Sequence, residues 1–152
     1  MTARTSAGST FKVCASAPAT FNVAGYAALT YTTVGEVTDF GEFGRRYNLV
    51  THNPVASRST VKKKGSYNEG AITLQLALDT DDTGQILMKA AAASDSDYYF
   101  EVLTQNGDKY YFPGQVMSFV VGIGNVDQIT SATVMVELTS SSTGIGIVES
   151  LS

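Results

Sequence analysis

Apolar and polar residues alternate along several short segments of this chain, and this alternation constrains the fold more than any other feature. A period of two is typical of a β-strand that buries one face. Residues 71–78 follow it closely, with aliphatic side chains at every second position: Ile72, Leu74, Leu76 and Leu78. Residues 132–138 show the same period, with Val134, Val136 and Leu138 on one side. The sequence therefore predicts a mainly β protein.

Further strands are expected where β-branched and aromatic residues end at turn-forming residues. Residues 98–103 and 109–112 flank Asn106-Gly107. This dipeptide is typical of a two-residue type I′ hairpin turn, in which both central residues have positive φ. The remaining expected strands cover residues 116–121 after Pro113-Gly114, residues 35–40 and 45–51 joined by a turn at 41–44, and residues 20–30.

One short α-helix is predicted at about residues 82–93. An acidic segment, residues 79–83, precedes it, and an Asp there can accept hydrogen bonds from the first free amides of a helix. Leu87, Met88 and the alanines at 90–93 are good helix formers. A helix of about three turns is marginal in water by itself, so we expect it to flank the sheet and dock on it.

One long connection, residues 52–69, contains serines, Asn53-Pro54 and a lysine run but little that could be buried. Structureless connections of this length are uncommon in a compact domain unless they are functional. Fixing its backbone would cost on the order of 20 kcal/mol, at about 1–2 kcal/mol per residue. We therefore expect the segment to be mobile in a lone subunit and ordered by a partner.

The length of 152 residues fits one domain, 1–152, with enough chain to bury a core. Both ends are small and polar, which predicts a flexible N-terminal arm at about residues 1–10 and a flexible C-terminal tail at about residues 140–152. No signal peptide is recognised at the N-terminus, and no apolar run approaches the ~18 residues that span a bilayer. We expect a chain that is made in the cytoplasm and does not insert into a membrane.

The charge content argues against tight binding of duplex DNA. The net charge is −4, the pI is near 4.8, and charged residues make up 16% of the chain. Proteins that hold DNA by neutralising phosphates usually carry a basic footprint. Fewer charges than the ~25% of an average domain suggest instead that part of the surface is covered by another molecule.

No pattern in the sequence predicts catalysis, a metal site or a cofactor. His52 is the single histidine and Cys14 the single cysteine, which leaves neither a multi-histidine zinc site nor a disulfide, and a Cys–His nucleophilic pair is disfavoured. The acidic segment 79–84 lacks the later ligands of a calcium loop, so helix capping is the preferred interpretation. The Gly-Ile-Gly sequences at 122–124 and 144–146 are incomplete dinucleotide fingerprints, interpreted as a strand-end turn and a flexible tail.

Charges of opposite sign are segregated along the chain. Residues 41–64 are basic and residues 79–101 are acidic, with one exception in each, Glu42 and Lys89. Solvated faces or a nucleic-acid contact through the lysine run would also explain the pattern. Complementary patches on one chain favour head-to-tail contact between copies. The candidate basic contacts are Arg58, Lys62, Lys63 and Lys64, and the candidate acidic counterparts are Asp79, Asp81, Asp82, Asp95 and Asp97.

From about residue 35 to residue 139, the chain resembles the major tail tube proteins of long-tailed, siphovirus-like bacteriophages and of related gene-transfer particles. The resemblance rests on the order of parts. A strand at 45–51 precedes the basic loop, and the alternating strand 70–78 follows it. The sequence Asp79-Thr-Asp-Asp-Thr-Gly-Gln85 then enters the short helix, and a hairpin at 98–112 and a strand within 125–138 complete the pattern.

The resemblance implies a non-enzymatic β-sandwich or barrel-like virion subunit without cofactors. Homohexameric rings of it would stack into a hollow tube, with inner strands continuing into one large barrel. The loop at 53–68 would reach the neighbouring ring through its basic residues. The tube would conduct DNA without binding it specifically, and it would meet the tail tip, tape measure and terminator proteins. The alternatives are the tube protein of a contractile secretion machine and a monomeric ligand-binding β-sandwich module.

Overall fold

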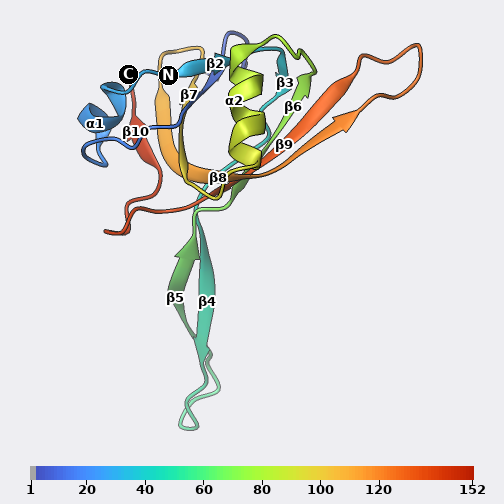
Figure 1. The fold of residues 1–152 in the computed structure, drawn as a ribbon. Helices are drawn as coiled ribbons and strands as arrows, with labels where there is room; N and C mark the ends of the chain where they lie inside the picture. The colour runs from blue at the N-terminus through green and yellow to red at the C-terminus, as the bar shows by residue number, and fades with distance from the viewer. Residues whose placement is uncertain (1–2) are drawn as a thin grey trace.

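The computed structural model describes residues 3–152, which form one curved antiparallel sheet, a projecting two-stranded hairpin and two helices (Figure 1). The helices are α1 (Val23–Ala27) and α2 (Thr83–Ala92). The hairpin consists of β4 (Arg46–His52) and β5 (Val61–Asn68). The strands of the sheet are β1 (Thr10–Cys14), β2 (Thr32–Val34), β3 (Val37–Asp39), β6 (Ala71–Ala77), β7 (Tyr98–Leu103), β8 (Lys109–Gly122), β9 (Ser131–Leu138) and β10 (Val148–Ser150).

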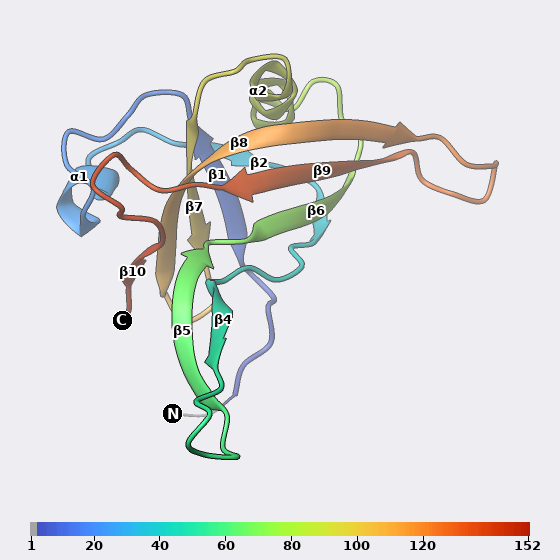
Figure 2. The ribbon, with the colours of Figure 1, turned by 90° about the horizontal axis from the view of Figure 1, so that it is seen from below.

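The long strand β8 joins the two halves of the sheet, whose order is β2-β1-β7-β8-β9-β6-β3, with β10 also paired to β8. Its first half pairs with β7 and its second half with β9, and the register shifts between Val116 and Ser118. Such a bulge bends a strand and increases its twist. The bend is visible in Figure 2. The expected mainly β fold with a helix flanking the sheet is confirmed. Of the two expected forms, sandwich and barrel-like, the single curved sheet corresponds to the barrel-like one.

The prediction that Pro113-Gly114 separates two strands is wrong, because both residues lie inside β8. Proline has no N–H for the ladder, and here its carbonyl accepts a hydrogen bond from the Thr139 amide at 3.0 Å. A Cβ atom at Gly114 would lie 2.8 Å from the Glu137 carbonyl oxygen, so glycine lets β9 approach closely. The dipeptide marks the place where β8 passes from one neighbour to the other.

The alternating strands bury their apolar faces as the sequence predicts. Ile72, Leu74 and Leu76 of β6 are buried, and alternate residues of β9, from Ala132 to Leu138, are buried beside them. Met88 and Ala91 of α2 close this core, and its other large members are aromatic: Phe11, Phe100 and Phe112. The predicted docking of the helix on the sheet is therefore confirmed.

The start of α2 is fixed by two polar side chains. Asp82 is the N-cap, and its Oδ2 accepts hydrogen bonds from the amides of Gln85 at 2.9 Å and Gly35 at 3.0 Å. Gln85 is 2% exposed. Its Nε2 donates to the carbonyls of Gly35 and Ala77, and its Oε1 accepts from the Asp79 amide. The capping interpretation of the acidic segment is thus confirmed.

Residues 20–30 form a helical turn, not the expected strand. The Asn22 Oδ1 accepts a hydrogen bond from the Gly25 amide at 2.8 Å and so caps α1. Tyr26 of this helix is buried, and its ring stacks on Tyr111 with centroids 5.3 Å apart. An apolar run of this length cannot be assigned to helix or strand by pattern alone, and the cap decides it here.

The hairpin β7–β8 is confirmed, but its turn is not of type I′. Only Gly107 has a positive φ, 94°, and its amide donates to the Thr104 carbonyl. Asn106 instead uses its side chain, with Oδ1 accepting from the Thr104 hydroxyl and Nδ2 donating to Asp108. The side-chain hydrogen bonds of Asn106 therefore select a longer loop than the dipeptide indicates.

Two segments expected to lack structure contain strands. Residues 61–68 of the expected loop 52–69 belong to β5 and His52 ends β4, so only residues 53–60 connect the two strands. In the expected C-terminal tail, β10 pairs with β8 through Val148 and Tyr111, and the Ser152 amide donates to Asp108 at 2.8 Å. Backbone hydrogen bonds, which polar composition does not reveal, hold both segments.

Candidate assembly surfaces

The hairpin of β4 and β5, here called the basic hairpin (residues 46–68), projects from the body of the fold (Figure 1). Except for Pro54 and Gly65, every one of its residues is exposed. Because strand side chains alternate, Lys62 and Lys64 point to one face and Lys63 to the other. The stem is held by the ladder and by an edge contact of the Tyr47 and Tyr67 rings, with centroids 5.4 Å apart.

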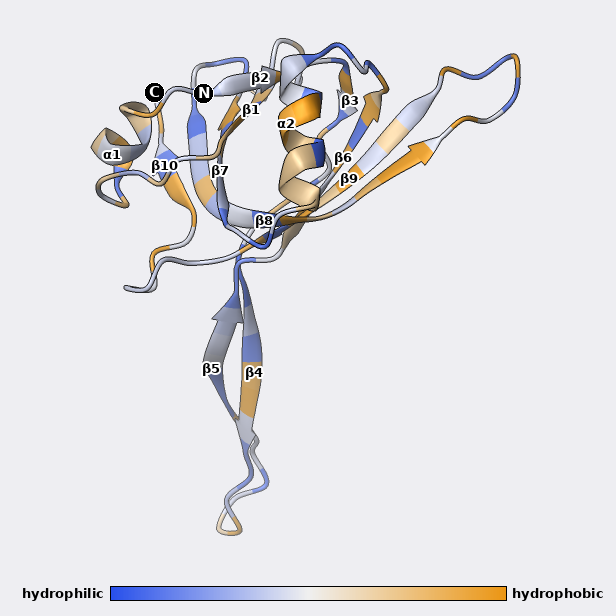
Figure 3. Cartoon of the chain, viewed as in Figure 1, coloured by the Kyte–Doolittle hydropathy of each residue, from blue (hydrophilic) through white to orange (hydrophobic). Residues whose placement is uncertain are grey.

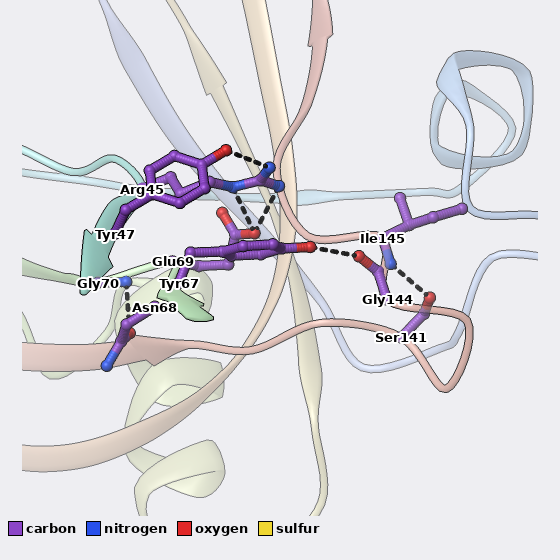
Figure 4. A network of polar contacts seen from close by, with 9 residues as sticks. All are labelled: Arg45, Tyr47, Tyr67, Asn68, Glu69, Gly70, Ser141, Gly144 and Ile145. Atoms are coloured by element: carbon purple, nitrogen blue, oxygen red, sulfur yellow. Dashed lines mark hydrogen bonds and ion pairs between the residues drawn. The ribbon is translucent and has the colours of Figure 1, made fainter. Parts of the chain in front are cut away.

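A polar network anchors the root of the basic hairpin (Figure 4). Glu69 is 5% exposed, and its Oε1 accepts hydrogen bonds from the Arg45 Nη2 at 2.8 Å and Nε at 3.1 Å. The Arg45 guanidinium lies 3.9 Å from the centroid of the Tyr67 ring, and the Tyr67 hydroxyl donates to the Gly144 carbonyl. Hydrogen bonds to Tyr47 and Glu69 hold the pKa of Arg45 above its ordinary value. This network sets the direction in which the hairpin leaves the sheet.

The candidate basic residues all lie on this projection. Arg58 is in the connection 53–60, and Lys62, Lys63 and Lys64 are in β5. The Lys64 Nζ lies 4.7 Å from the centroid of the Tyr47 ring. Leu49 and Val50 are opposite Lys64 and Lys63 and are 66% and 52% exposed. The projection therefore presents aliphatic as well as cationic side chains.

The candidate acidic residues are not one cluster. Asp79 and Asp81 lie before α2, whereas Asp95 and Asp97 follow it, and a ten-residue helix separates the two pairs by roughly 15 Å. Asp82 is used within the subunit as the N-cap, and the Asp97 Oδ1 accepts a hydrogen bond from the Gln115 side chain at 2.9 Å. The surface around α2 thus offers two separate acidic sites.

Two unpaired strand edges were not predicted from the sequence. β7 pairs with β8 only as far as Gly114, so in the described chain no strand covers β8 on that side from residue 115 to residue 122. On the opposite border, β3 pairs with β6 only at Leu76 and Gln75, which leaves residues 71–74 without a strand partner there. Strand β8 therefore carries an open edge at residues 115–122, and open edges readily pair with another chain. On the β6 border no strand pairs with residues 71–74, but the segment around Gly41 lies against them, since a Cβ atom at Gly41 would be 2.9 Å from the Thr73 carbonyl oxygen.

A second projection was also missed. The distal part of the β8–β9 hairpin, here called the apolar arm (residues 117–131), extends beyond the body of the fold (Figure 3). Val126, Ile129 and Ile123 are 98%, 79% and 70% exposed, and Met117, Val120 and Val121 are also exposed. The Val and Ile residues on both sides of Gly122-Ile123-Gly124 were the available signal, but they were interpreted as a strand end.

The residues considered for chemistry lie far from any reactive arrangement. Cys14 is buried in β1, with its Sγ 3.4 Å from the Ser16 amide, and His52 is exposed at the end of β4. Within residues 3–152, no group of three or more His, Cys, Asp or Glu side chains is placed to hold a metal ion. In the same residues, no helix has the length and apolar character needed to cross a membrane.

A tyrosine cluster packs on one part of the sheet. Tyr99 and Tyr111 are buried beside Tyr26, and burial raises the pKa of each of these three hydroxyls above its ordinary value. Lys12 lies across the sheet from Glu101, which is 5% exposed, with the Nζ 3.7 Å from Oε1. These side chains form a cross-strand cluster.

Comparisons with known proteins identify the fold. No family model and no curated protein matches the sequence. Three solved structures are similar over nearly the whole chain. The anti-feeding prophage baseplate, sixfold symmetrised, has a TM-score of 0.69 and 8% identity and covers 92% of this chain and 94% of its own. The tail of an empty gene transfer agent particle, refined with C6 symmetry, has a TM-score of 0.68 and 11% identity and covers 99% of both chains.

The virion of the native gene transfer agent particle gives a similar result, with a TM-score of 0.67, 11% identity and coverage of 97% of this chain and 99% of its own. At such low identity, a similarity of this kind establishes the fold and leaves the role to be argued from the surfaces. The resemblance to tail tube proteins is thereby confirmed at the level of architecture: this chain has the fold found in the tails and baseplates of phage-like particles.

Proposed function

We propose that this chain is the repeating structural subunit of a hollow tail tube, in which homohexameric rings stack and DNA passes through the lumen. The observation that carries the proposal is the open edge of β8 at residues 115–122, together with a β6 border on which residues 71–74 have no strand partner. Edges of this kind are an aggregation liability in a monomer, and closure into a barrel removes them. The similar tail and baseplate assemblies were determined with sixfold symmetry, which supports the hexamer.

The ring is formed when the open edge of β8, residues 115–122, pairs with the β6–β3 border of the next copy. Each subunit then uses its β8 edge toward one neighbour and its β6–β3 border toward the other. Such a heterologous contact forms a closed ring when a whole number of copies completes a full rotation. The strands β8, β9 and β6 supply the inner wall. Hydrogen bonding between the previously unpaired backbone groups at every junction favours closure without a cofactor.

The rings stack through the basic hairpin. A strand of eight residues reaches about 26 Å at 3.3 Å per residue, far enough to leave its own subunit. The basic residues of the hairpin contact the two acidic sites of a copy in the adjacent ring. The basic residues are Arg58, Lys62, Lys63 and Lys64. One acidic site consists of Asp79 and Asp81, and the other consists of Asp95 and Asp97. Asp82 is excluded from this role because its carboxylate caps α2.

The mature location is the virion tail. The net charge of −4 suits a lumen through which DNA slides without specific binding. The ends of the tube meet tail tip, tape measure and terminator proteins. The tube protein of a contractile secretion machine is the second candidate, and the similarity to the anti-feeding prophage baseplate favours keeping it.

Negative-stain electron microscopy of the concentrated protein tests this function. The wild type is expected to form stacked rings. Long tubes would favour a phage-like tail, whereas isolated rings would favour a secretion machine. A variant with Lys62→Glu, Lys63→Glu and Lys64→Glu is expected to form single rings that no longer stack. The matched control replaces the same three lysines with arginine, keeps the charge and is expected to stack. A wild type that stays a monomer at every concentration would contradict the proposal and favour a monomeric binding module.

A further inference from the structure

The apolar arm needs a cover that its own subunit does not provide. The three most exposed aliphatic residues, Val126, Ile129 and Ile123, lie around its tip, and Asp127 is the only charged residue between 117 and 131. Scattered apolar residues are ordinary on a surface, but a contiguous set on one projection marks an interaction site. The arm is distinct from the basic hairpin, which carries the lysines and leaves the opposite end of the sheet (Figure 1).

The same chain carries an apolar groove that is open to solvent. It lies between α2 and β8, has a volume of about 330 Å³, and is lined chiefly by Leu78, Ile86, Ala90, Phe119 and Val121. Ile86 of α2 is 52% exposed. Lys89, the single base of the acidic segment, stands at the rim. The groove is therefore a small, mainly apolar site whose lining also includes one base, Lys89, and one acid, Asp79.

We propose that the apolar arm of one copy docks in the groove between α2 and β8 of a second copy, with Asp127 beside Lys89. The inference rests on the proposed self-assembly and names a second contact between copies, separate from the basic hairpin. Arm and groove are complementary in both respects that the structure offers. Aliphatic side chains of the arm meet a mainly apolar lining. Asp127, the only charge on the arm, meets Lys89, the only base in a lining that also contains Asp79.

Continuity with the open edge favours a second copy as the occupant. Val121 belongs both to the groove and to the root of the arm, and it lies in the part of β8 that has β9 on one side and no strand on the other. An arm that enters the groove therefore lies beside the edge that ring closure must cover. Since each copy has one arm and one groove, the contact is head-to-tail and repeats from copy to copy.

Cysteine cross-linking tests the contact directly. In a Cys14→Ala background, Val126→Cys and Ile86→Cys are placed in separate chains, so that a disulfide can join only different copies. A disulfide requires Cα atoms within about 7 Å. The mixture is expected to give a Val126–Ile86 linked peptide by mass spectrometry. The control mixture of Val126→Cys with Glu149→Cys, an exposed site on β10, is expected to give none. Equal cross-linking in both mixtures overturns the proposal.

A charge exchange gives an independent readout. Asp127→Lys and Lys89→Glu alone are each expected to lose assembly in sedimentation velocity, and the double variant is expected to regain it. Glu149→Lys is the control that retains assembly. Single variants that assemble like the wild type overturn the docking while leaving the tube intact. The wild type could instead form dimers and no tubes. If either single variant dissociates these dimers and the double variant restores them, the docking is supported and the tube is contradicted. A wild type that never associates overturns both.

Discussion

Gln85 is the side chain on which the docking of α2 most depends, and its removal should be costly. It is 2% exposed and makes three hydrogen bonds through its side chain: to the Gly35 carbonyl at 3.0 Å, the Ala77 carbonyl at 2.9 Å and the Asp79 amide at 2.9 Å. These bonds tie the helix start to the end of β6 and to the β2–β3 turn. A substitution therefore leaves three backbone groups in these two segments without this partner.

The magnitude follows from these three bonds. A hydrogen bond contributes about 1 kcal/mol net, and a buried polar group left without a partner costs about 1–3 kcal/mol. Gln85→Met, which keeps the length of the side chain and removes the amide, is therefore expected to lower the free energy of unfolding by about 3 kcal/mol. For a chain of this size, about 2–4 °C per kcal/mol converts this loss into a fall in Tm of about 6–12 °C.

The assay is urea unfolding of dilute, unassembled protein, followed by circular dichroism, with Tm measured on the same samples. Gln105→Met is the matched control, because Gln105 is exposed in the β7–β8 turn and the same exchange there should change stability by less than about 0.5 kcal/mol. A loss of less than about 1 kcal/mol for Gln85→Met would refute the reasoning. It would mean that water or a rearranged loop satisfies the three backbone groups.

Two further predictions concern the C-terminus and the basic hairpin. Hydrogen bonds from the Ser152 amide and Asn106 hold the pKa of Asp108 below its ordinary value, so its contribution to stability is present above that ordinary value and is lost as the pH falls through the folded value. NMR of the Ser152 amide should report release of the C-terminus in acid, and Asp108→Asn should abolish that pH dependence. Hydrogen exchange should be fast across residues 53–60 in dilute protein and slow in tubes, and equal rates in the two states would contradict an assembly role for the hairpin.

The elements that the sequence predicted correctly are those buried within the subunit. In β6 and β9 one face contacts the core, so Ile72, Leu74 and Val134 recur at every second position. The prediction of α2 rested on residue types and not on an apolar periodicity. Asp82 precedes residues that favour helices, and its side chain caps the helix in the structure. Both signals are local and need no knowledge of the rest of the fold.

The errors arose where a tertiary contact decides between local alternatives. Residues 20–30 are apolar enough for a strand, but burial of Tyr26 against Tyr111 and the Asn22 cap make the segment a helix. Pro113 usually ends a strand, yet β8 continues through it because Thr139 donates to its carbonyl. In neither case does the sequence near the residue identify its distant partner.

The basic hairpin was predicted as a loop for a different reason, and the same reason explains why the apolar arm was missed. Alternation appears only when one face of a strand is buried inside the subunit. β4 and β5 are exposed on both faces, so Lys62, Lys63 and Lys64 can follow one another without disturbing the core. At the arm the opposite pattern arises, with Val120 and Val121 adjacent and both exposed. Side chains of a strand that does not pack on the core of its own subunit can complement the surface of another subunit. For this reason we propose that both projections form contacts between copies.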